Sequence, residues 1–69
     1  MAKKSVYEAG EDGVEYRICV YPTYQKESWK VVIYGPVGDV QYSATFESPK
    51  DDGAIKLAWE AFKKSRSWK

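Results

Sequence analysis

The densest run of strand-forming residues lies in the middle of the chain, over residues 29–34 (Trp-Lys-Val-Val-Ile-Tyr). β-Branched and aromatic side chains favour strands, and Gly35 and Pro36 end the run. Successive side chains of a strand point to opposite faces of the sheet. The inward set of this run is Trp29, Val31 and Ile33, and the outward set is Lys30, Val32 and Tyr34. The inward set predicts a core face. The outward set is more apolar than an ordinary solvated face, which makes it a candidate binding surface.

Two further segments, residues 14–21 and 40–47, alternate in the same way. Their expected core side chains are Tyr16, Ile18, Val20, Tyr42, Ala44 and Phe46. Their expected outward side chains are Glu15, Arg17, Cys19, Tyr21, Gln41, Ser43, Thr45 and Glu47. Short connections predict that the three strands are antiparallel neighbours. Residues 5–9 are a candidate fourth strand at the edge, joined to the first segment by a turn over residues 10–13.

The C-terminal segment predicts one helix that runs to about residue 65. Ser48 is the expected N-cap, with Pro49 at N1 and an acid, Asp51, at N3. The side chains that share one side of this helix are Ala54, Ile55, Ala58, Ala61 and Phe62.

These elements predict a single α+β domain over residues 1–69, with an ordered core at about residues 14–65. Its architecture is a three-stranded antiparallel sheet, or a four-stranded one if residues 5–9 pair, packed on one face by the C-terminal helix. One helix covers one face of a sheet, so the other face meets water or a partner.

Composition argues against an enzyme. The chain has no His and one Cys, which excludes histidine-based catalysis, an intramolecular disulfide and a paired-cysteine metal site. Cys19 is expected to be an apolar filler rather than a nucleophile. Asp51 and Asp52 diverge by roughly 100° on a helix and do not form a metal site. We therefore expect no catalytic residue, cofactor or metal.

The net charge is only +1, from 11 basic and 10 acidic residues. No signal peptide and no long apolar run is visible, so we expect a cytoplasmic protein without membrane contact. The initiating Met1 suggests a complete small protein, with a domain cut out of a longer chain as the alternative.

The order of the parts resembles a known family. A strand with Tyr-Arg-Ile (16–18), a strand opening with Trp (29–34), a strand ending in Phe (42–48) and an Ala-rich helix (52–59) follow one another. This order is similar to the DNA-binding domain of plant ethylene-response factors and to the arm-type DNA-binding domain of phage tyrosine integrases. The resemblance implies that the helix-free face enters the major groove. By position it implies that Arg17, Tyr21, Trp29 and Lys30 contact DNA and that Lys26 lies near phosphate.

Two hypotheses about function follow. The first is a module that binds double-stranded DNA through the helix-free face. The second is a phage or mobile-element protein that binds or inhibits a host protein through the apolar and aromatic part of that face; a homodimer through the face or an edge strand is one version of it. Neither involves a small-molecule substrate. The candidate binding residues are Arg17, Tyr21, Lys26, Trp29, Lys30, Val32, Tyr34 and Ser43.

Overall fold

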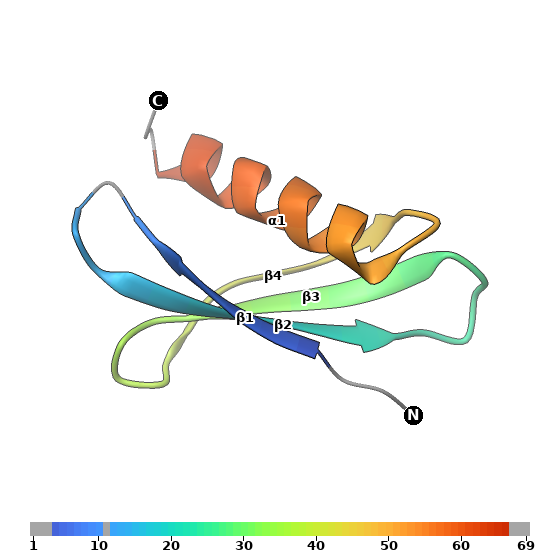
Figure 1. Ribbon diagram of the computed structural model, residues 1–69, viewed down its shortest axis with the longest axis horizontal. Helices are drawn as coiled ribbons and strands as arrows, with labels where there is room; N and C mark the ends of the chain where they lie inside the picture. The colour runs from blue at the N-terminus through green and yellow to red at the C-terminus, as the bar shows by residue number, and fades with distance from the viewer. Residues whose placement is uncertain (1–3, 11, 67–69) are drawn as a thin grey trace.

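The computed structural model describes residues 4–10 and 12–66 and contains one antiparallel sheet with a helix across one face (Figure 1). The strands follow chain order in space, β1-β2-β3-β4. The elements are β1 (Lys4–Ala9), β2 (Glu15–Pro22), β3 (Ser28–Tyr34), β4 (Val40–Glu47) and α1 (Asp51–Ser65). The predicted α+β architecture is confirmed, in its four-stranded form.

The candidate edge strand is β1, and a tight turn joins it to β2. The Gly10 N–H donates to the Val14 carbonyl at 2.8 Å. Gly13 has a φ of +80°, a left-handed conformation that glycine adopts without steric cost. The Asp12 carboxylate accepts from the Val14 N–H and from the Tyr16 hydroxyl, at 3.1 and 2.9 Å. The turn is therefore fixed by its own side chains, and β1 adds residues 4–9 to the predicted core range.

The core lies between α1 and the inner faces of the central strands. It consists of Tyr16, Ile18, Val20, Val31, Ile33, Ala54, Ile55, Ala58 and Phe62. Phe62 contacts Tyr16 in a T-shaped arrangement, with ring centroids 5.2 Å apart. Small residues at positions 54 and 58 are completely buried, so α1 approaches the sheet closely. With the exception of Ala44, the predicted inward side chains of the three strands thus form the core or pack against it.

The start of the helix differs from the prediction. Ser48 is not the N-cap; α1 begins at Asp51, and its N-cap, Lys50, makes no side-chain capping hydrogen bond. Ser48 instead accepts the Lys50 N–H on its Oγ at 3.3 Å, while its carbonyl accepts the Trp29 indole N–H at 2.9 Å. The helix starts later because Ser48 is held in the corner between β4 and α1 by these two bonds.

One predicted outward residue, Gln41, lies on the other side. The β3–β4 register is irregular between Ile33 and Tyr34, which pair with Tyr42 and Val40. Gln41 is therefore the extra residue of a β-bulge. Its Oε1 accepts a hydrogen bond from Arg66 Nη1 at 3.1 Å, at the C-terminal end of α1. The bulge turns Gln41 toward the helix and places Val40 opposite Tyr34.

Candidate nucleic-acid interface

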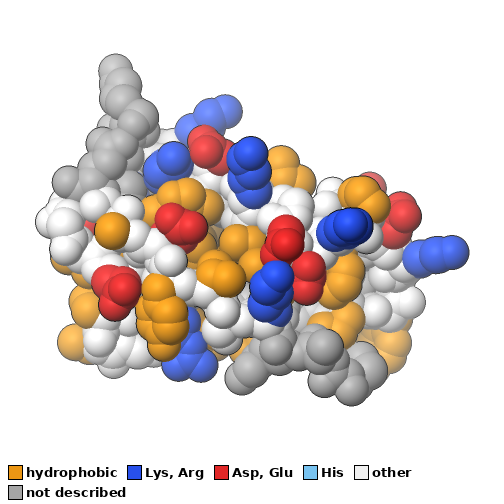
Figure 2. Space-filling view, viewed as in Figure 1, with side chains coloured by type: hydrophobic (Ala, Val, Ile, Leu, Met, Phe, Trp, Pro, Cys, Tyr) orange, Lys and Arg blue, Asp and Glu red, His pale blue; other side chains and the backbone are white. Residues whose placement is uncertain are grey.

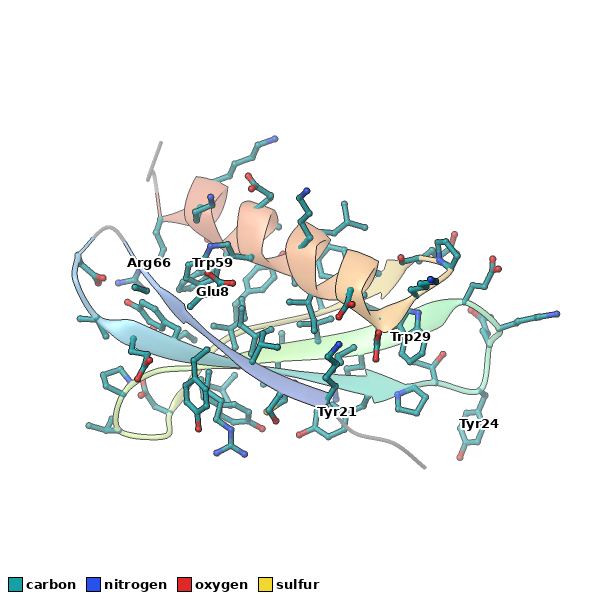
Figure 3. All side chains as sticks on the ribbon, in the orientation of Figure 1. Glu8, Tyr21, Tyr24, Trp29, Trp59 and Arg66 are labelled. Carbon is teal, nitrogen blue, oxygen red and sulfur yellow. The ribbon has the colours of Figure 1, made fainter. Side chains whose placement is uncertain are left out.

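The helix-free face carries its side chains in rows that cross the strands. The strand register gives three rows: Tyr7–Arg17–Tyr34–Val40, then Ser5–Cys19–Val32–Ser43, then Tyr21–Lys30–Thr45. The first and third rows hold long aromatic and cationic side chains. The middle row holds short ones. Figure 3 shows Tyr21 directed away from α1, on this face of the sheet.

The short middle row is covered by its neighbours. Cys19 is fully buried and Val32 is only 7% exposed, although no helix lies over them. Ser5 Oγ lies 3.4 Å from Cys19 Sγ and closes that end of the row. Arg17 and Tyr21, from the two flanking rows, both hydrogen-bond with Cys19, and little apolar surface is left at the centre of the face. Cys19 is therefore buried, as an apolar filler would be, although alternation along the strand places it among the outward side chains of this face.

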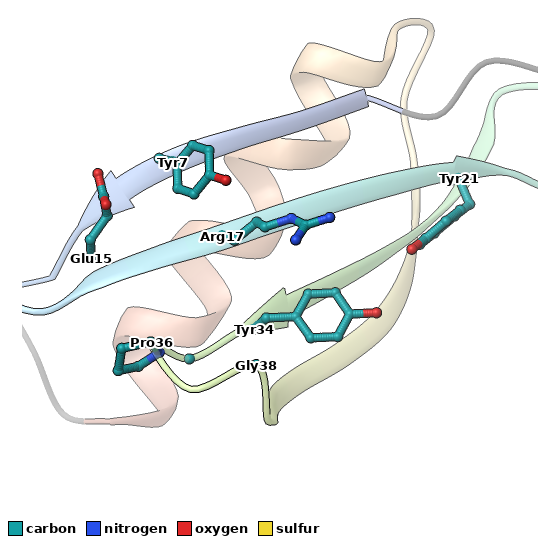
Figure 4. A pocket seen from close by; sticks show the side chains of 8 residues that line it. Tyr7, Glu15, Arg17, Tyr21, Tyr34, Pro36 and Gly38 are labelled. Carbon is teal, nitrogen blue, oxygen red and sulfur yellow. The ribbon is translucent and has the colours of Figure 1, made fainter.

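A hollow of about 500 Å³ opens on this face beside the β3–β4 turn (Figure 4). Its walls come from β1, β2, β3 and the turn. The lining residues are Tyr7, Glu15, Arg17, Tyr21, Tyr34, Gly35, Pro36 and Gly38. The Arg17 guanidinium carbon lies 5.9 Å from the centre of the Tyr34 ring, within the range of a cation–π contact. The hollow therefore combines aromatic walls with one cation.

The electrostatics of the hollow favour the neutral form of Tyr21 and the charged form of Arg17. A hydrogen bond with Tyr34, together with burial, raises the pKa of Tyr21 to about 12. The neighbouring Cys19 side chain, as a hydrogen-bond partner, raises the pKa of Arg17 above its ordinary value. At neutral pH this part of the face thus offers phenolic hydroxyls and a guanidinium. Glu15, exposed on the rim, adds one carboxylate.

The structure brings together most of the predicted binding residues and separates two. Arg17, Tyr21, Lys30, Val32, Tyr34 and Ser43 lie on the helix-free face. Lys26 is exposed in the loop between β2 and β3, beyond the end of the sheet. Trp29 lies on the opposite face, where it packs against the core and donates to Ser48 (Figure 3). The inward orientation predicted for Trp29 is confirmed. The DNA contact that the resemblance implies for Trp29 would instead require this side chain to lie on the helix-free face.

Tyr7 is the main residue of this face that sequence reasoning missed. It pairs with Arg17 across β1 and β2 and is 62% exposed. The alternation of residues 5–9 contains the necessary signal: if this segment is a strand, Tyr7 lies on the same face as Arg17.

No family model, curated protein or solved structure matches this chain. Within residues 4–10 and 12–66, no helix has the length and apolar character needed to span a membrane. The same residues contain no group of three or more Cys, Asp or Glu side chains that could hold a metal ion.

Proposed function

We propose that the protein is a small, non-enzymatic DNA-binding module and that its helix-free sheet face is the binding surface. The observation that carries the proposal is the arrangement of Arg17 and Lys30 among tyrosine side chains on this open face. Cations supply the attraction to phosphate, and tyrosine hydroxyls and rings supply hydrogen bonds and stacking.

The exposed chemistry of the face favours a nucleic acid over an apolar protein surface. A protein that docks through hydrophobic contact needs an accessible apolar patch. Cys19 and Val32, the apolar centre of the sheet, are 0% and 7% exposed. Apart from Val40 on the edge strand, which is 61% exposed, what remains accessible is polar, aromatic and cationic, which is the character of surfaces that bind nucleic acids.

The charge distribution predicts weak binding with a modest salt dependence. Each phosphate neutralised on duplex DNA contributes about 0.9 to the slope of log K against log salt. Arg17, Lys30 and the more distant Lys26 therefore give a slope of about −2 to −3. By contrast with the helix-free face, the side of the molecule that carries α1 has basic and acidic side chains mixed together (Figure 2).

The test is duplex binding measured by fluorescence anisotropy over a range of salt concentrations. Arg17→Ala combined with Lys30→Ala should weaken binding and reduce the salt slope by about 1.8. The matched control is Lys56→Ala combined with Lys64→Ala, which removes the same charge from exposed positions of α1. The control should leave most of the affinity in place.

Two results would count against the proposal. One is the absence of duplex and single-strand binding at the lowest salt at which the protein stays folded. The other is an equal loss of affinity in both double variants, since this would show a response to net charge rather than to the helix-free face. Circular dichroism of each variant confirms that the fold is retained.

A further inference from the structure

We propose that the hollow beside the β3–β4 turn receives one unpaired nucleobase of a single strand, which stacks on Tyr7 while a phosphate of that strand pairs with Arg17. This inference rests on the proposed function and narrows it from DNA in general to unpaired DNA. It assigns a binding role to β1, the strand outside the three-strand resemblance.

Tyr7 is suited to stacking because its ring is accessible. It is 62% exposed on the outermost strand, and within residues 4–10 and 12–66 no aromatic ring stacks on it, although its hydroxyl interacts electrostatically with the neighbouring Arg17 guanidinium. Tyr34, in the same row, already has the Arg17 guanidinium near its ring at 5.9 Å. Compared with Tyr34, Tyr7 is thus the lining tyrosine whose ring surface is open to a ligand. Stacking on such a ring tolerates any base, since every base has a π-face.

The dimensions of the hollow suit a single nucleotide. Its volume of about 500 Å³ lies within the range of small-ligand pockets, which is roughly 300–1,000 Å³. Gly38 contributes no side chain to the wall, and the space beside its Cα is open. A base inside a duplex reaches such a hollow only after it is unpaired and unstacked, at a cost of a few kcal/mol. A base of a single strand needs no such unpairing, which is why we assign the hollow to unpaired DNA.

The charges along the face favour one direction for the backbone of a bound nucleic-acid strand. Arg17 lines the hollow, and Lys30 lies in the row that contains Tyr21, four residues farther along β2. At about 3.3 Å per residue this places the two rows about 13 Å apart. A strand whose base occupies the hollow can therefore extend its backbone from Arg17 toward Lys30. Glu15, on the rim beside Tyr7, repels a backbone that leaves in the other direction.

The experiment compares a labelled oligothymidylate with a duplex of the same length, by fluorescence anisotropy at low salt. The wild-type protein should bind the single strand more tightly. Tyr7→Leu should lower single-strand affinity by about 5- to 150-fold, the loss that follows from removing one base–aromatic stack. Tyr7→Phe should retain the affinity. Tyr24→Leu is the matched control, because Tyr24 is a fully exposed tyrosine in the β2–β3 loop and does not line the hollow.

A second variant addresses the same hollow without altering a ring. Glu15→Gln removes the carboxylate of the rim at an exposed position and should strengthen single-strand binding several-fold.

The outcomes separate the inference from the proposed function. Equal affinity for the two oligonucleotides and no effect of Tyr7→Leu, with a loss in the Arg17→Ala and Lys30→Ala double variant, would overturn the inference alone. Absence of binding to either oligonucleotide would overturn both. A loss in Tyr24→Leu as large as in Tyr7→Leu would also overturn the inference, because the hollow would then have no special role.

Discussion

Tyr21 and Tyr34 show how single residues on the helix-free face depend on one another. Their hydrogen bond, with burial, raises the pKa of Tyr21 from 10.0 to about 12. Because the folded pKa is the higher one, the resulting stabilisation is complete below pH 10 and is lost as the pH rises from 10 to 12. Burial and a hydrogen bond with Asp12 also raise the pKa of Tyr16. We therefore expect the ultraviolet titration of phenolate to show late-titrating tyrosines, and Tyr21→Phe to remove one of them. Tyr34→Phe should lower the pKa of Tyr21; an unchanged titration would contradict the hydrogen bond.

The sequence predicts which face each of these residues occupies but not how accessible it is. Period-two alternation is enough to place Arg17, Tyr21, Lys30 and Tyr34 together. It gives no information about the reach of long side chains over short ones, which is why Val32 is predicted to be open and is nearly buried. Accessibility on an open sheet depends on pairs of side chains across strands, and the register that sets these pairs comes from the structure.

At the scale of the elements, the first turn of α1 makes a testable packing prediction. An alanine in place of a helical glycine ordinarily gains up to about 1 kcal/mol of stability. At Gly53 a Cβ would overlap the Oγ of Ser48, which is buried. Gly53→Ala should therefore destabilise the protein, by about 1–3 kcal/mol, as overpacking does. Urea denaturation measures the change.

The control for this prediction is a double-mutant cycle. Ser48→Gly removes the obstructing side chain, so in its presence Gly53→Ala should cost much less than in the wild type. Strictly additive costs would show that the two residues do not interfere. Ala54→Gly, one position along the same helix, gives the ordinary cost of a glycine at a buried site for comparison.

The elements themselves could be predicted from local patterns, whereas their irregularities could not. Strands 14–21, 29–34 and 40–47 and the helix follow from alternation and turn residues, and the structure confirms them with small shifts at their ends. The bulge at Gln41 and the late start of α1 depend on contacts with Arg66 and Trp29, residues 25 and 19 positions away. Such distant contacts leave no periodic signal in the chain.

At the scale of the whole molecule, stability depends on a core that a single helix closes. A chain of 69 residues is expected to have a free energy of unfolding of about 3–10 kcal/mol. Phe62 is 1% exposed and contacts Tyr16, Tyr42 and Trp59. Removing such a side chain costs about 3–5 kcal/mol. Phe62→Ala should therefore remove a large part of the free energy of unfolding and lower the melting temperature markedly, measured by thermal denaturation followed by circular dichroism.

Leu57 is the matched control for Phe62, because it lies on the same helix and is 48% exposed. Leu57→Ala should lower the free energy of unfolding by well under the cost of Phe62→Ala, since half of its side chain stays in water in the folded protein. Similar losses in the two variants would mean that the buried contacts of Phe62 are not what holds α1 to the sheet. The sheet would then keep its strands when α1 is removed, whereas a core shared between the two layers predicts that both unfold together in one transition.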